Sequence, residues 1–241
     1  MRLGYRHIDT AQAYENEAEV GDGLKAAGLP REDVFVTTKL VLRLSPPEDF
    51  VKATKESLQR LKLSDVNLLL LHWPPKPPMT LKETLEALVA VKKAGLTRNI
   101  GGSNFTTGQL EEAGKLISEP LVCDQVEIHP YIDQAKVLGT CKKLGIAPVA
   151  YCPIARGKIN DDPVIGGIAK AHNKSIAQVT LRWLSQQGIV IIPRTSKVER
   201  AKENFEVFDF TLSPDEMSAI SARKRPDGRI VNPAWAPIWD N

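Results

Sequence analysis

Short apolar runs alternate with longer amphipathic stretches along most of the 241 residues. The apolar runs are nearly continuous rather than alternating, which is typical of parallel strands covered by helices. Seven strands are predicted on this basis, at Tyr5–Thr10, Val34–Leu40, Val66–Leu71, Arg98–Gly102, Leu121–Val126, Ile146–Tyr151 and Ile189–Ile192.

Apolar residues recur at helical spacing after each predicted strand, so that helices and strands alternate. Glycines follow four of these stretches at positions 28, 95, 145 and 188, where a left-handed helix end favours them. The predicted helices are Glu17–Ala27, Pro47–Leu61, Leu81–Ala94, Thr107–Ile117, Gln134–Leu144, Pro163–Gln187, Val198–Asn204 and Ser213–Ala222.

Repeated strand–helix units without a break in composition predict one α/β domain over residues 1–241, a (β/α)8 TIM-type barrel. Only seven strands are recognisable, and Met1–Gly4 is typical of the last turn of a helix. We therefore expect that a preceding strand and most of its helix are absent. Such a barrel is either a fragment or is completed by another segment, because open strand edges are costly.

Composition argues against several classes of partner. The net charge of +3 gives no support for nucleic-acid binding, and no apolar run approaches the roughly 18 residues of a membrane span. The three cysteines form no closely spaced pair, and small buried apolar residues are their simplest interpretation. An odd number of cysteines without a close pair predicts a reducing compartment, so we expect a cytoplasmic protein. We expect no nucleic-acid or membrane partner.

Polar residues lie at or just after the ends of the first three predicted strands: Asp9 and Tyr14, then Lys39, then His72. Taken singly, three of them have a structural explanation. Asp9 could be a turn former, Tyr14 a surface ring, and His72 a half-buried histidine whose hydrogen bonds are satisfied. Lys39 is harder to explain so, because a lysine at the end of a buried strand needs a partner, and Asp9 on the neighbouring strand is available. The carboxyl ends of barrel strands share one end of the fold, so the four side chains are expected to converge.

A converging carboxylate, phenol, amine and imidazole can deliver a proton to a carbonyl oxygen. An ammonium group beside Tyr14 favours the phenolate and makes the hydroxyl a better proton donor. Asp9 would hold Lys39 in place, and His72 could donate a hydrogen bond to the substrate oxygen. The four histidines share no ligand spacing, so no metal site is predicted.

Seven segments carry long, ordered motifs: Gly4–Tyr14, Thr37–Leu40, Leu68–Pro74, Ile192–Thr195, Glu199–Asn204, Gly228–Pro233 and Ala236–Asp240. They resemble the aldo-keto reductase family, and the resemblance runs from Gly4 to about Asn241. The tail is similar to the bacterial branch that includes 2,5-diketo-D-gluconate reductases. Family members also carry an N-terminal hairpin, a first strand and a full first helix before the first motif, and none of these is found here.

The resemblance implies an NADPH-dependent oxidoreductase that transfers a hydride to the carbonyl of a small aldehyde, ketone or keto-sugar, without metal or flavin. Tyr14 would be the general acid, Lys39 and Asp9 its tuning partners, and His72 the group that orients the substrate. We expect a monomer.

The resemblance also implies contacts for the coenzyme and the substrate. Tyr151 would stack on the nicotinamide, and Ser103, Asn104 and Gln125 would bind its carboxamide. Glu203 and Asn204 match positions near the adenine. The tail, residues 225–241, would lie over the active site. The expected pocket walls are Trp73, with Trp235 and Trp239 of the tail as further candidates.

The segment around Arg194, Thr195, Ser196 and Arg200 suits an anion. These residues surround the predicted start of a helix, where backbone N–H groups and the helix dipole favour negative charge. Arginine can grip a phosphate with two hydrogen bonds, so the 2′-phosphate of NADP fits better than the bare ribose of NAD. A solvated basic helix start is the alternative. The sequence has no Rossmann-type glycine motif after a strand.

Two alternatives to an active reductase remain. The chain could be an inactive truncated fragment, or a nucleotide-binding regulatory subunit on the same fold, of the kind that accompanies membrane channels. The ordinary bacterial-like tail argues against the regulatory subunit.

Overall fold

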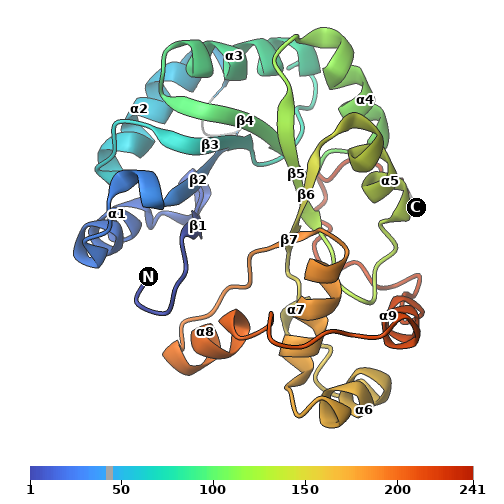
Figure 1. Cartoon of the computed structure of the whole chain (residues 1–241). Helices are drawn as coiled ribbons and strands as arrows, with labels where there is room; N and C mark the ends of the chain where they lie inside the picture. The colour runs from blue at the N-terminus through green and yellow to red at the C-terminus, as the bar shows by residue number, and fades with distance from the viewer. Residues whose placement is uncertain (42–45, 241) are drawn as a thin grey trace. The chain divides into compact units, whose positions relative to one another are not determined.

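A computed structural model of the chain describes residues 1–41 and 46–240 (Figure 1). These residues form two compact units. The first comprises residues 1–124, 140–146 and 237–240, and the second comprises residues 125–139 and 147–236. Strand β5 (Leu121–Glu127) and helix α5 (Ala135–Leu144) each run through a boundary between the units.

Parallel strands form the sheet of the first unit. They are β1 (His7–Asp9), β2 (Phe35–Leu40), β3 (Val66–Leu71), β4 (Thr97–Ser103) and the start of β5, in chain order. Every residue of β3 is buried, because both faces of this central apolar strand are covered.

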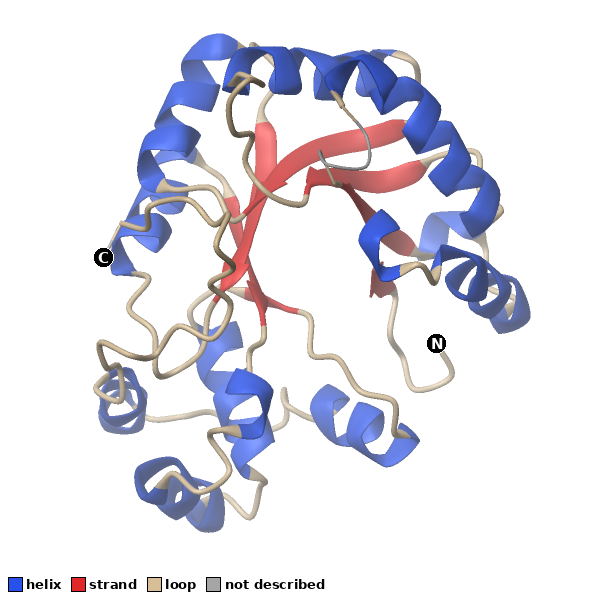
Figure 2. Cartoon of the chain, turned by 180° about the vertical axis from the view of Figure 1, so that it is seen from behind, coloured by secondary structure: helices blue, strands red, loops and turns tan. Residues whose placement is uncertain are grey.

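Helices pack along one face of this sheet, as Figures 1 and 2 show for α1 (Glu17–Ala27), α2 (Phe50–Leu61) and α3 (Leu81–Lys93). Helix α4 (Thr107–Leu116) follows β4. Glu17 is buried at the base of α1, where it accepts a hydrogen bond from Thr38 of β2 (2.6 Å) and pairs with Arg60 of α2 (2.8 Å). Three 3-10 turns complete the unit: η1 (Gln12–Tyr14), η2 (Arg31–Asp33) and η3 (Pro47–Asp49).

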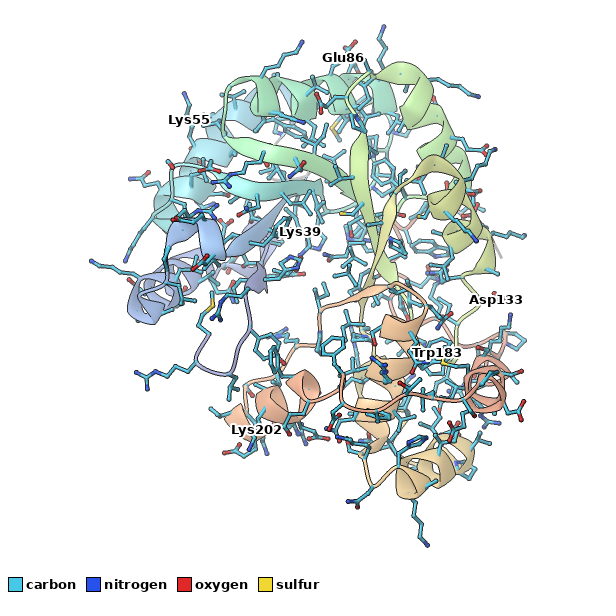
Figure 3. The ribbon with its side chains drawn as sticks, viewed as in Figure 1. Lys39, Lys55, Glu86, Asp133, Trp183 and Lys202 are labelled. Carbon is cyan, nitrogen blue, oxygen red and sulfur yellow. The ribbon has the colours of Figure 1, made fainter. Side chains whose placement is uncertain are left out.

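The second unit contains the end of β5 and strands β6 (Ala147–Tyr151) and β7 (Val190–Ile191), which pair in parallel. Trp183, labelled in Figure 3, is buried and donates a hydrogen bond to Ser221 (3.1 Å). The helical segments are η4 (Ala155–Gly157), α6 (Pro163–Ala171), α7 (Ile176–Gln186), α8 (Val198–Phe205) and α9 (Pro214–Ser221).

The prediction of one helix over Pro163–Gln187 is wrong, because α6 and α7 are separate. Asn173 has a left-handed backbone (φ 53°), which ends the first helix. Ser175 then caps the second with a reciprocal pair of hydrogen bonds to Gln178. The capping serine lay within the predicted helix but was read as part of its interior.

The remaining helix-end predictions agree with the structure. Gly28, Gly95, Gly145 and Gly188 all have positive φ, and Ser213 forms a capping box with Glu216. The prediction of an α/β fold with seven strands is confirmed, and the strands follow chain order. The single domain over residues 1–241 stays a prediction, and Asn241 of the tail lies outside the described residues. None of the helices in the described part of the chain is long and apolar enough to cross a membrane.

Candidate active site

The register of the first strands places Asp9, Lys39 and His72 on one face of the sheet. Asp9 pairs with Thr37, two residues before Lys39, and Lys39 pairs with Leu70, two residues before His72. Side chains two positions apart in a strand point to the same face. From one strand to the next, the polar residue therefore lies two positions further along the strand. The three side chains form a diagonal row across the sheet.

Lys39 is the centre of this row and is completely buried. Its Nζ forms an ion pair with Asp9 Oδ1 and donates a hydrogen bond to the carbonyl oxygen of Thr10 (2.9 Å). Figure 3 shows Lys39 on the sheet, whereas Lys55 and Glu86 point outward from helices α2 and α3. Burial of an ammonium is costly unless it is paired, so the Asp9 carboxylate is required for Lys39 to occupy this position.

Tyr14 and His72 lie next to Lys39. The Nζ atom of Lys39 is 5.1 Å from the centroid of the Tyr14 ring, and the rings of Tyr14 and His72 meet edge to face with centroids 5.6 Å apart. Turn η1 holds Tyr14, whose residue surface is 49% exposed. The phenol therefore combines a buried cation on one side with access to solvent on the other.

Ser103 and Asn104 follow His72 in the same unit, at the end of β4. Asn104 adopts a left-handed backbone (φ 64°), and its Nδ2 donates to the backbone oxygen of His72 (3.0 Å) and to Ser103 Oγ (3.1 Å). Both residues are buried. The carboxyl ends of β1 to β4 thus contribute one connected cluster of polar side chains.

The end of the tail contacts this cluster within the first unit. The rings of Trp239 and Trp73, the residue after His72, have centroids 6.0 Å apart. Asp240 accepts hydrogen bonds from the backbone N–H (2.9 Å) and the hydroxyl (2.7 Å) of Thr107, the first residue of α4. Sequence reasoning identified the tryptophans but missed Asp240 and Thr107, because nothing in their local pattern links positions so far apart.

A buried carboxyl group at Asp124 was also missed. Its Oδ1 accepts a long hydrogen bond from Phe105 N–H (3.4 Å), and no described residue lies within hydrogen-bond distance of Oδ2. Burial raises the pKa of Asp124 to about 8, and the negative charge of Asp240 adds to the shift. In the sequence, the position of this carboxyl group inside the apolar run Leu121–Val126 could have indicated that it is buried.

In the second unit, Gln125 is buried on β5 and Tyr151 ends β6. The backbone oxygen of Tyr151 accepts a hydrogen bond from Ile128 N–H (3.4 Å). Both residues thus lie near the carboxyl ends of paired strands, where the family resemblance expects them.

Beside them is a fully buried pair that the sequence reading did not select, Glu127 and His129. His129 Nε2 lies 2.8 Å from Glu127 Oε1, while its Nδ1 accepts the N–H of Tyr131 (3.3 Å). The proton therefore sits on Nε2. Burial tends to raise the pKa of Glu127, but hydrogen bonds from His129 and from the N–H groups of Ile230 and Val231 hold it below its usual range.

The tail is held against Tyr131 as well as Glu127. Arg225 N–H donates to the Tyr131 backbone oxygen (3.1 Å), and the Arg225 guanidinium lies 4.1 Å from the centroid of the Tyr131 ring. A β-carbon on Gly228 would lie 1.7 Å from that same oxygen, so only glycine fits. Trp235, further along, is 48% exposed.

The candidate anion segment precedes and begins α8. Lys197 N–H donates to Thr195 Oγ1 (3.1 Å) just before the helix starts, and the side chains of Arg194, Ser196 and Arg200 are exposed. Glu203 and the buried Asn204 follow on the helix. Exposed cations at a helix start can receive an anionic ligand without first breaking an internal ion pair.

The structure therefore brings together, within the first unit, Asp9, Tyr14, Lys39, His72, Trp73, Ser103 and Asn104. The other expected site residues belong to the second unit: Gln125, Tyr151, Arg194, Thr195, Ser196, Arg200, Glu203, Asn204 and Trp235. In the described ranges, no three histidine, cysteine, aspartate or glutamate residues are grouped so as to hold a metal ion.

Comparison with known proteins gives concordant matches. Residues 1–224 match the model of the aldo/keto reductase family. The chain is 39% identical over its full length to methylglyoxal reductase DkgB of Escherichia coli O157:H7, of which it covers 91%. It is 41% identical to glyoxal reductase of Bacillus subtilis (strain 168), over 97% of this chain and 84% of the relative.

Solved structures agree in fold. A protein provisionally named 2,5-diketo-D-gluconic acid reductase B superposes on all of this chain and 86% of its own, with a TM-score of 0.97 and 47% identity. A Bombyx mori aldo-keto reductase in complex with NADP superposes on 92% of this chain and 79% of its own, with a TM-score of 0.86 and 34% identity. These matches confirm the TIM-type barrel class predicted from the sequence.

Proposed function

Since the chain belongs to the aldo/keto reductase family, we propose that it reduces small aldehydes, ketones or keto-sugars through the cluster around Lys39. It is an NADPH-dependent oxidoreductase of carbonyl compounds, in line with its relatives. Short dicarbonyl compounds are the first substrates to test, because two relatives are named for methylglyoxal and glyoxal. The observation that carries the proposal is that the buried Lys39, paired with Asp9, lies beside the half-exposed Tyr14 ring.

The proposed role of Tyr14 is to donate a proton to the carbonyl oxygen. NADPH, when bound, would supply the hydride for the carbonyl carbon and would leave as NADP⁺. The Tyr14 hydroxyl gives its proton to the oxygen, and an alcohol results. Because the Tyr14 residue is 49% exposed, water can return the proton between turnovers.

Lys39 and Asp9 would act on Tyr14 through charge. A buried ammonium close to the phenol ring stabilises the negative charge that develops on the oxygen as the proton leaves. Asp9 keeps Lys39 in position. His72, whose ring meets the Tyr14 ring edge to face, would orient the substrate oxygen by a hydrogen bond, with Trp73 as an apolar wall beside it.

The proposed coenzyme contacts follow the family pattern. Ser103, Asn104 and Gln125 would bind the carboxamide of the nicotinamide, and Tyr151 would stack on its ring. At the other end, the segment from Arg194 to Arg200 would take the 2′-phosphate. Glu203 and Asn204 of α8 would lie near the adenine.

We expect Arg200→Ala to weaken NADPH binding by about tenfold and to leave NADH binding nearly unchanged. A charge-assisted contact to phosphate is lost, and NADH has no phosphate at that position. Coenzyme fluorescence titrations measure both constants. Lys202→Ala on the same helix is the matched control, because Lys202 pairs with Glu206 (3.8 Å) and should leave both constants unchanged. Equal weakening of NADPH and NADH by Arg200→Ala would contradict a phosphate contact.

Two measurements separate an active reductase from the alternatives. The first follows NADPH consumption with methylglyoxal, and the second compares thermal unfolding with and without NADPH. Saturating coenzyme at about 100 times its Kd should stabilise a binding-competent fold by about 2.7 kcal/mol. Stabilisation without turnover would favour a nucleotide-binding regulatory subunit. Neither stabilisation nor turnover would identify an inactive fragment.

We also propose that the protein is a cytoplasmic monomer. The three cysteines are free, which suits a reducing compartment. Sedimentation at working concentrations tests the oligomeric state. A second species that forms with increasing concentration would contradict a monomer.

A further inference from the structure

The last described residue of the chain binds the start of a helix beside the candidate catalytic cluster. Asp240 Oδ2 accepts the N–H of Thr107, and Asp240 Oδ1 accepts its hydroxyl, at 2.9 and 2.7 Å. We name this pair of hydrogen bonds the Asp240–Thr107 clasp. It joins two positions 133 residues apart in the sequence.

Two features make the clasp a strong contact. Thr106 and Gln109 already form a capping box at the start of α4, so the N–H of Thr107 is a remaining donor of the first turn. Asp240 satisfies this donor. The carboxylate also lies at the positive end of the helix dipole, where negative charge is stabilised. Two hydrogen bonds to one ionised group fix its orientation as well as its position.

The clasp lies directly beside Trp239 in the chain. Trp239 is covalently next to Asp240, and its ring contacts Trp73, the residue directly after His72. The neighbouring Ile238 is 96% exposed, so it adds little packing to this part of the tail. The clasp and the contact between the two tryptophan rings both join this stretch to the rest of the first unit.

We propose that Asp240 is a positioning residue that holds Trp239 on Trp73 and thereby shapes the substrate pocket beside His72. Asp240 itself touches neither substrate nor coenzyme. The clasp sets how tightly a carbonyl substrate is held, while proton delivery by Tyr14 is unaffected. The kinetic part of this inference rests on the proposed reductase function; the arrangement of the two rings does not.

The first test is spectroscopic and requires no turnover. Two tryptophan rings in contact give a coupled signal in near-ultraviolet circular dichroism, and Trp239→Phe defines the spectrum without that pair. Asp240→Ala and Thr107→Val should each shift the spectrum towards that of Trp239→Phe. Asp33→Ala is the matched control, because Asp33 is an exposed aspartate of the same unit and lies far from the tail in the sequence. Its spectrum should equal that of the unmodified chain.

The second test uses the substrate. Asp240→Ala should raise KM for methylglyoxal by about tenfold, the effect of a lost contact to a charged group, and change kcat by less than about twofold. Asp240→Ala combined with Thr107→Val should be no worse than Asp240→Ala alone, because both remove the same clasp. Thermal unfolding of each variant confirms that the fold is retained.

The outcomes separate the two proposals. A near-ultraviolet spectrum of Asp240→Ala equal to that of the unmodified chain overturns the clasp, whatever the activity. A shifted spectrum with unchanged KM overturns its role in the pocket. If the unmodified chain reduces no carbonyl compound, the proposed function fails, while the spectra still decide whether the clasp holds Trp239.

Discussion

Tyr14→Phe should lower kcat for carbonyl reduction by about 10²–10⁴-fold, the range that a positioned proton donor contributes. Phenylalanine keeps the ring that contacts His72 and lies beside Lys39, and removes only the hydroxyl. NADPH affinity should therefore remain close to that of the unmodified chain. Single-turnover absorbance of NADPH measures the chemical step, and fluorescence titration measures the affinity.

The control for this variant is Tyr5→Phe, which removes a hydroxyl from a residue before β1 that has no proposed part in the reaction. It should leave kcat within about twofold of the unmodified chain, because the Tyr5 hydroxyl takes no part in the proposed proton transfer. Retention of full kcat in Tyr14→Phe would remove Tyr14 as the proton donor. Loss of NADPH binding together with kcat would point to damage of the fold rather than of the chemistry.

Asp124→Asn should change how stability depends on pH. The folded chain holds the Asp124 proton up to about pH 8, whereas an unfolded aspartate loses it near pH 4. The folded form thus binds more protons over this interval, so the unfolding free energy falls as pH rises. The contribution of Asp124 to the unfolding free energy is complete below about pH 4 and is lost as the pH rises towards 8.

Asparagine keeps the shape of the side chain and carries no titrating proton. Relative to the unmodified chain, Asp124→Asn should gain stability between pH 4 and 7, with an upper limit on the order of 4 kcal/mol at about 1.4 kcal/mol per pKa unit. Urea unfolding at a series of pH values measures the difference. Asp33→Asn, an exposed carboxylate of the same unit, should show no comparable slope. Parallel pH profiles for Asp124→Asn and the unmodified chain would contradict the buried titration.

The hydrophobic pattern of the sequence and the polar residues at the ends of its apolar runs predicted most of the first unit. Continuous apolar runs identified β2 and β3, and the polar residues that end them predicted the cluster around Lys39, because strand register is a local property. The split between α6 and α7 was missed because the helical periodicity continues across Ser175. A single capping residue, rather than a change in hydrophobic pattern, decides that boundary.

Long-range contacts were beyond the reach of the sequence. The hydrogen bonds that Thr107 donates to Asp240 and that the tail backbone donates to Glu127 join positions more than 100 residues apart. No periodicity or spacing encodes such contacts, since they depend on where the chain returns after several elements. Asp124 is different: its carboxyl group interrupts an apolar run, so burial without a full set of partners could have been inferred.

Complete burial of Lys39 also affects its chemical reactivity. Acylating reagents attack the uncharged amine and need access to it, and Lys39 offers neither while it is enclosed and paired with Asp9. Lysines on the outer helices, such as Lys55 in Figure 3, are exposed and open to the same reagents. In a labelling experiment on the folded chain, Lys39 would therefore report unfolding of this strand, because the peptide that carries it would be modified only once β1 and β2 separate.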